Sequence, residues 1–194
     1  MRTTLLVVCT LALAICASAW AAETPTVTTP PADVYKVEYF SNANTAGAPD
    51  ATVRLTNPGT AAGNVCANVF VFDANQELSE CCSCFLSPDG LRTLSVNTDL
   101  THNPLTGVTL NTGVIKVIST TLTGGTCPLP TKINATPALR AWATHIQNST
   151  FAVTETNAQD ATLSTGEVTR LQAECSAVSL DGSGSGVCSC GTGD

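Results

Sequence analysis

The residues of this chain that could support chemistry are its ten cysteines, eight of which lie beyond residue 21. Three fall within four positions in Glu80–Gly90, which reads ECCSCFLSPDG, and two more lie in the C-terminal sequence CSCGTGD. Clustered cysteines bind metals as thiolates, exchange electrons as dithiol pairs, or join distant segments as disulfides. The eight are Cys66, Cys81, Cys82, Cys84, Cys127, Cys175, Cys188 and Cys190.

The spacing of these cysteines favours disulfides. Structural zinc sites typically show two CxxC or CxxH pairs at regular spacing, which the chain does not contain. A thioredoxin-like site needs its cysteine pair at the start of a helix in a βαβ unit, and the sequence shows no such context. Neither His102 nor His145 is near a cysteine. We therefore expect no metal and no cofactor, with a thiolate metal-binding module as the alternative.

The pairing of the cysteines is only loosely limited by their positions. Vicinal Cys81 and Cys82 point to opposite sides of an extended chain, so we expect them to bond different neighbours. One arrangement joins the segment from Cys81 to Cys84 with Cys66, with a late helix and with the C-terminal tail.

Residues 1–21 have the layout of a secretory signal peptide, with Arg2, an apolar run from Leu5 to Ile15, and then small residues. That run is short for a membrane span and no later stretch is apolar enough, so we expect no span in the mature chain. An even number of cysteines beyond such a signal predicts a disulfide framework. We expect a secreted protein that is extracellular, at the cell surface or in the periplasm.

The mature chain is acidic and carries no motif of a known catalytic site. Loss of Arg2 with the signal leaves 7 basic and 15 acidic side chains, a net charge of −8, which argues against nucleic acid as a partner. Motifs of serine hydrolases, zinc proteases and nucleotide-binding loops are absent from the sequence, so we assign no catalytic residue. The acids form no distinctive pair, and His145, opposite Trp142 in an alternating strand, is expected at the surface or at a sheet edge.

Short alternating or β-branched stretches separated by turn sequences predict seven or more strands. NVCANVFVFDA is apolar on both faces and is predicted to be central, and Leu91–Leu100 is a further strand candidate. Ser164 and Glu167 have capping-box spacing and precede apolar residues at helical intervals, which predicts a helix at about 165–178.

This pattern predicts a mainly β fold, an antiparallel β-sandwich of immunoglobulin-like or similar type, held by disulfides and with one short C-terminal helix. We expect a Thr/Pro-rich leader at 22–33, the sandwich domain at 34–180, and a Gly/Ser-rich tail at 181–194 that its cysteines tie down.

Four segments, FDANQELSECCSC, LRTLSVNTDLTHNPLTG, RAWATHIQN and the terminal CSCGTGD, resemble a set of uncharacterised secreted bacterial proteins that are rich in cysteine and β-structure. The resemblance extends over most of the mature chain, from about Val34 onward. It implies a bacterial, exported setting. It implies no activity and no catalytic residues, because none are assigned to that set.

Together these observations predict a non-enzymatic β-domain, secreted or at the cell surface, with a structural or interaction role. A sharper version is a subunit of an extracellular filament, in which residues 22–33 add as a strand to the open sheet edge of a neighbouring copy. Another surface protein is the other expected partner. The alternatives are a hydrolase or carbohydrate-binding protein on a sandwich scaffold, which as a hydrolase needs two converging acids, and the thiolate metal-binding module.

Overall fold

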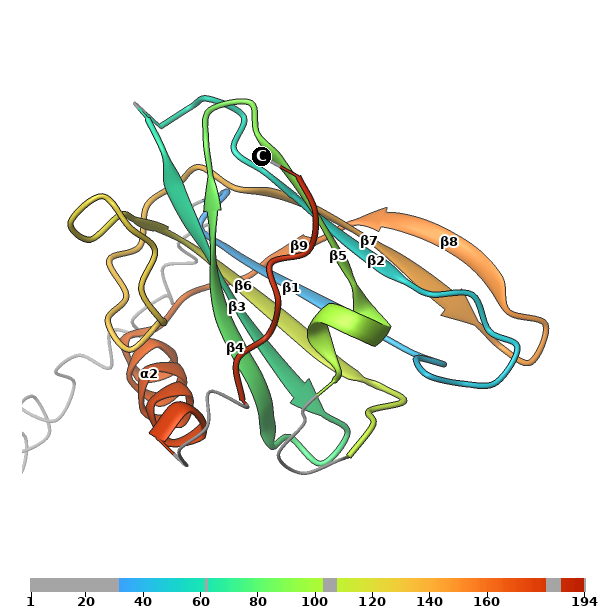
Figure 1. Ribbon diagram of the computed structural model, residues 1–194. Helices are drawn as coiled ribbons and strands as arrows, with labels where there is room; N and C mark the ends of the chain where they lie inside the picture. The colour runs from blue at the N-terminus through green and yellow to red at the C-terminus, as the bar shows by residue number, and fades with distance from the viewer. Residues whose placement is uncertain (1–31, 62, 103–107, 181–185, 194) are drawn as a thin grey trace, which may run out of the picture.

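The computed structural model describes residues 32–61, 63–102, 108–180 and 186–193, which form two antiparallel sheets packed face to face and a helix on the outer face of one sheet (Figure 1). The mainly β fold, the sandwich of antiparallel sheets, the disulfides and the C-terminal helix predicted from the sequence are confirmed. The predicted signal peptide, residues 1–21, and residues 22–31 of the predicted leader lie outside the described residues.

The five-stranded sheet has the order β4-β3-β6-β1-β9, and the four-stranded sheet has the order β5-β2-β7-β8. The strands of the first are β4 (Leu78–Leu86), β3 (Val65–Asp73), β6 (Gly113–Thr121), β1 (Tyr35–Phe40) and β9 (Gln159–Asp160). The strands of the second are β5 (Leu91–Ser95), β2 (Thr52–Thr56), β7 (Arg140–Gln147) and β8 (Ala152–Asn157). The chain passes from the second sheet to the first at Ala158, between β8 and β9.

The hydrophobic core has two layers because both faces of the five-stranded sheet are covered. Every residue of Val65–Phe72 is buried, as predicted for a central strand. Val69 of this strand packs toward the four-stranded sheet, in the same cluster as Leu55 of β2. Phe70 points to the other face, where it packs in a second cluster with Leu171 of the helix. Each large apolar side chain buried in this way stabilises the fold by roughly 1.5–3 kcal/mol.

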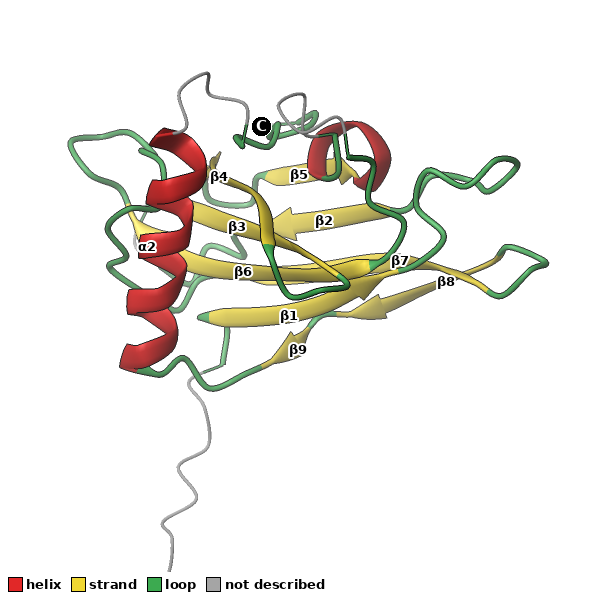
Figure 2. Cartoon of the chain, turned by 90° about the horizontal axis from the view of Figure 1, so that it is seen from below, coloured by secondary structure: helices red, strands yellow, loops and turns green. Residues whose placement is uncertain are grey.

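The predicted late helix is confirmed as α2 (Thr165–Leu180), which lies against the outer face of the five-stranded sheet (Figure 2). Oγ of Ser164 accepts the backbone N–H of Glu167 at 3.1 Å and so caps the first turn. The Glu167 carboxylate accepts Nζ of Lys116 at 2.7 Å and the hydroxyl of Tyr35 at 3.0 Å. These contacts fix the N-terminal end of the helix on β6 and β1.

Two elements near the cysteine cluster differ from the prediction. Leu78–Leu86 is a nine-residue strand, whereas the periodicity predicts no strand there. Its signal is hidden because the polar Glu80 lies on the buried face while Cys81 and Phe85 lie on the other, so that apolar and polar residues do not alternate. The strand expected over Leu91–Leu100 ends at Ser95 and continues as a π-helical turn, Val96–Leu100. Oγ of Ser95 accepts the N–H of Thr98 at 2.9 Å, which caps that turn.

Candidate interaction site

All eight cysteines of the predicted mature chain form disulfides in the structure, pairing as Cys66–Cys127, Cys81–Cys175, Cys82–Cys188 and Cys84–Cys190. As expected, vicinal Cys81 and Cys82 bond different neighbours. Cys81 belongs to the cluster beneath the helix, whereas Cys82 belongs to the cluster between the sheets. The two sides of one strand are thereby joined to two different segments.

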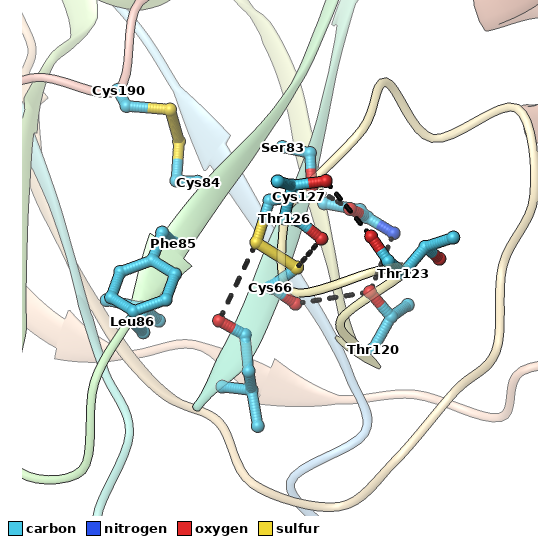
Figure 3. Close-up of a disulfide and its surroundings, with 12 residues drawn as sticks. Cys66, Ser83, Cys84, Phe85, Leu86, Thr120, Thr123, Thr126, Cys127 and Cys190 are labelled. Atoms are coloured by element: carbon cyan, nitrogen blue, oxygen red, sulfur yellow. Dashed lines mark hydrogen bonds between the residues drawn. A yellow bond between two sulfur atoms is a disulfide. The ribbon is translucent and has the colours of Figure 1, made fainter. Parts of the chain in front are cut away.

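The expected link between Cys66 and the segment from Cys81 to Cys84 is wrong. Cys66 of β3 lies opposite Phe85 of β4, and Cys84 lies opposite Ala67, so Cys66 and Cys84 point to opposite faces of the sheet. Cys66 bonds instead to Cys127 in the loop after β6, with 5.6 Å between the two Cα atoms (Figure 3).

The C-terminal tail closes one side of the sandwich. Figure 1 shows the segment 186–193 running between β4 and β5, the end strands of the two sheets on that side. At the edge of β4 the N–H of Cys81 donates to the carbonyl of Gly186 at 2.8 Å. At the edge of β5, Thr93 and Thr192 exchange backbone hydrogen bonds of 3.0 and 3.1 Å. Two of the four disulfides fix the tail there, so both edges are paired by covalently anchored backbone.

Two glycines allow the tail to lie this close to β5. Gly191 has a φ of +62° and Gly193 a φ of +112°, a region that side chains other than glycine rarely adopt. A Cβ on Gly191 would lie 2.1 Å from the carbonyl oxygen of Thr93, and one on Gly193 would lie 2.1 Å from that of Leu91. The glycines of the terminal CSCGTGD are therefore required by a close backbone approach.

The tail disulfides also bear on the thiolate metal alternative. The sulfurs of Cys82, Cys84 and Cys190 lie within 4.8 Å of one another, a spacing that a zinc ion could bridge. Each of these sulfurs is bonded to another sulfur, and a disulfide sulfur lacks the thiolate charge that ligation requires. Metal binding at this cluster would need prior reduction of two disulfides.

On the opposite side of the four-stranded sheet, β8 is the end strand, and all six of its residues are exposed. The N–H of Ala158 donates to the carbonyl of Ala141 on β7 at 3.0 Å. Because hydrogen-bonded residues alternate along an antiparallel strand, the backbone groups of Val153, Glu155 and Asn157 point away from β7. No other segment of the described residues pairs with this outer edge.

Beside β8, a buried acid–base pair joins the two sheets. Nε2 of His145 on β7 lies 2.9 Å from Oε2 of Glu38 on β1 and 2.8 Å from Oγ1 of Thr156 on β8. The ring of Tyr39 stacks on the imidazole with 4.2 Å between ring centroids. Glu38 is 8% exposed and His145 is 1% exposed, so water has almost no access to the pair.

The expected surface or edge position of His145 is wrong, because the face of β7 that carries it is the buried one. Ala141 and Ala143 lie on that face and are buried, while Trp142 on the other face is partly exposed. The period of two identifies two faces of a strand but does not decide which of them is inside. Small alanines leave room between the sheets at this point, and the imidazole fills it.

Burial shifts both members of the pair toward their uncharged forms. It raises the pKa of Glu38 to about 7, opposed by a hydrogen bond from the backbone of Gln159. It lowers the pKa of His145, opposed by a hydrogen bond with the backbone of Tyr39. Burial therefore favours the uncharged forms of both side chains where the two sheets meet.

Glu80 of β4 is a second buried acid, which the sequence analysis does not single out among the acids. It is 1% exposed, and burial raises its pKa to about 7. Its Oε1 accepts no hydrogen bond from the described residues. The available signal was its spacing, because Glu80 lies two residues before Cys82 on a strand and therefore faces the same interior.

Three cavities lined by described residues do not supply the acid pair that the hydrolase alternative needs. One of about 340 Å³ lies beside the Glu38–His145 pair and is lined by Val37, Glu38, Tyr39, Val114, Thr156 and Gln159. A second, next to Val34, is lined by no acid, and a third, next to Lys36, is lined only by Asp160 among acids. Each of these three cavities thus has at most one carboxylate.

Comparison of the chain with protein-family models, with curated proteins and with solved structures finds no match. Within the described residues, none of the helices is both long enough and apolar enough to cross a membrane. Four disulfides are typical of a protein that folds in an oxidising compartment. Function must therefore be argued from the geometry of the two sides of the sandwich.

Proposed function

We propose that this chain is a non-enzymatic, exported β-domain that acts by contact with other proteins, and that its copies assemble as subunits of an extracellular filament. The observation that carries the proposal is the difference between the two sides of the sandwich. One side is paired with a disulfide-anchored tail, and the other presents the exposed strand β8.

This difference matters because an exposed strand edge is normally protected. Proteins shield such edges with short strands, bulges, prolines, lysines or a covering segment, since an open edge pairs with other chains. Here two disulfides hold a covering segment over β4 and β5, while six consecutive residues of β8 are exposed. An edge left open in a domain braced by four disulfides supports a role in assembly.

The experiment is to export the mature chain, residues 22–194, through an oxidising periplasm and to measure its mass by sedimentation velocity over a series of concentrations. We expect species larger than one chain that grow with concentration, and polymers in negative-stain electron micrographs. A single monomeric species at every concentration, with no polymer in the micrographs, would contradict the proposal.

A variant lacking residues 22–31 is the matched control, because these residues precede the described domain, whereas the Asp33 carbonyl accepts the N–H groups of Ala138 and Leu139 within it. We expect this variant to keep the melting temperature of the longer chain within a few degrees and to sediment as a monomer. If it still polymerises, residues 22–31 are not the element that joins the subunits.

A further inference from the structure

The described part of the sandwich has four sheet ends, and three of them are protected. The β4 and β5 ends pair with the tail. The third end is β9 of the five-stranded sheet, which is only two residues long. Past the residues of β1 that pair with β9, Tyr39 of β1 is held by side chains of β7. Nε2 of Gln147 donates to the Tyr39 hydroxyl at 2.7 Å, and the ring of His145 stacks on that of Tyr39.

The fourth end, β8, has none of these protections within the described residues. It contains no proline and no lysine, and its register with β7 runs without a bulge from Ala152 to Asn157. Val153 is 55% exposed, and its neighbour Thr154 is β-branched. The outward backbone groups of Val153 and Glu155 give an incoming strand two positions at which to pair, and the outward carbonyl of Asn157 accepts Nε2 of Gln159 at 3.1 Å.

The segment before the domain has a sequence suited to such pairing. Thr26-Val27-Thr28-Thr29 is a run of four β-branched residues between Pro25 and Pro30. β-Branched residues favour extended strands, and the prolines limit the paired length. Between Glu23 and Asp33 the segment carries no charge, so it can approach an acidic domain without the repulsion that two whole domains experience.

The position at which the described chain begins limits antiparallel pairing of the leader with β8 of its own copy. The N–H of Asp33 donates to Oδ1 of Asp160 at 3.2 Å, and its carboxylate contacts Arg140 at the start of β7. This is the Asn157 end of β8, because Trp142 pairs with Asn157. An antiparallel partner from the same copy would first have to run the ~20 Å length of β8 and turn. Too few of residues 22–31 would then remain to pair.

We propose that β8 is the acceptor edge for residues 22–31 of a second copy, which add to it as an antiparallel strand and so extend the four-stranded sheet from one subunit to the next. This inference deepens the proposed function and rests on it. Its partner is a second copy of this chain, and its occupant is the segment around Val27.

Two variants separate the donor from the acceptor. Val153→Pro removes an outward N–H of β8 and leaves the hydrogen bonds to β7 in place, and proline is tolerated on edge strands. Val153→Thr keeps the N–H and the β-branched shape and is its matched control. We expect V153P to sediment as one chain with a melting temperature within a few degrees of wild type, and V153T to assemble as wild type does.

The closing experiment mixes V153P, which has a donor but no acceptor, with the variant lacking residues 22–31, which has an acceptor but no donor. We expect each alone to be monomeric and the mixture to form a 1:1 complex that does not grow further. If wild type polymerises but V153P polymerises equally well, or the mixture stays monomeric, the β8 inference fails while the proposed function stands. If wild type itself is monomeric at every concentration, the proposed assembly and the β8 inference both fail. The leader would then be inferred to pair with its own domain.

Discussion

Nε2 of His145 lies 2.9 Å from Oε2 of Glu38, and this contact joins the four-stranded sheet to the five-stranded sheet next to the open strand β8. Both side chains are buried, and burial raises the pKa of Glu38 and lowers that of His145. The burial of these two titratable groups therefore makes the stability of the fold depend on pH.

The first prediction concerns Glu38→Gln. The pKa of Glu38 is about 7 in the folded chain against an ordinary 4.5, so its contribution to stability is complete below pH 4.5 and is lost as pH rises to about 7. Glutamine cannot ionise, so E38Q should be more stable than wild type at pH 8 by about 1–3 kcal/mol and lose less stability over that interval. Urea unfolding at pH 4.5, 6 and 8 measures this.

Glu80→Gln is the companion variant, because the pKa of Glu80 is raised to about 7 by the same cause and with the same sign. His145 acts in the opposite direction. Because the pKa of His145 is lowered in the folded chain, its contribution to stability is complete above the ordinary histidine pKa and is lost as the pH falls below that ordinary value.

For the first prediction, an E38Q protein whose stability changes with pH as steeply as that of wild type would show that the Glu38 carboxyl stays solvated.

The second prediction concerns the disulfide Cys82–Cys188. Replacing both cysteines by serine should lower the free energy of unfolding by about 2–5 kcal/mol and loosen residues 186–188 from the edge of β4, while Cys84–Cys190 still holds the rest of the tail. The matched control replaces Cys66 and Cys127 by serine, which removes a disulfide but leaves the whole tail in place. We expect thermal unfolding to show a loss of stability in both variants, and light scattering to show new aggregation only in the variant whose β4 edge is uncovered. Equal aggregation of the two would contradict the edge-covering role.

The third prediction tests the close approach of the tail without touching a cysteine. Gly191→Ala places a Cβ against the Thr93 carbonyl at a left-handed φ, so it should lower the free energy of unfolding by about 1–3 kcal/mol. Gly166→Ala in α2 is the control, because its Cβ would meet nothing closer than 3.9 Å and alanine favours helix by about 0.5–1 kcal/mol. Chemical unfolding of both variants checks the difference, and a neutral G191A would mean that the tail does not lie on β5.

Much of the fold could be predicted from the sequence because its signals are local. Alternation marked the strands, and the Ser164–Glu167 spacing marked the start of α2. The opposite directions of Cys81 and Cys82 followed from extended geometry alone. Each of these signals lies within a few consecutive residues, where backbone geometry determines the outcome.

The features that could not be predicted depend on contacts between distant segments. β4 was missed because Glu80 is polar on the buried face and Phe85 is apolar on the other, which removes the alternation. The burial of His145 depends on Glu38, more than a hundred residues away, and on small alanines that turn their face of β7 inward. The pairing of the tail with β4 and β5 requires knowing which strands end the sheets, and strand order is not a local property of the sequence.

Disulfide mapping of the exported chain tests whether disulfides anchor the C-terminal tail over the edges of β4 and β5. The chain is alkylated under denaturing, non-reducing conditions and analysed by intact mass and peptide fragmentation. We expect no alkylated cysteine and the four pairs Cys66–Cys127, Cys81–Cys175, Cys82–Cys188 and Cys84–Cys190. Alkylated Cys82, Cys84, Cys188 and Cys190 in a protein that carries a bound metal ion would contradict it, because the tail would then be a ligand segment rather than a disulfide-anchored cover for the sheet edges.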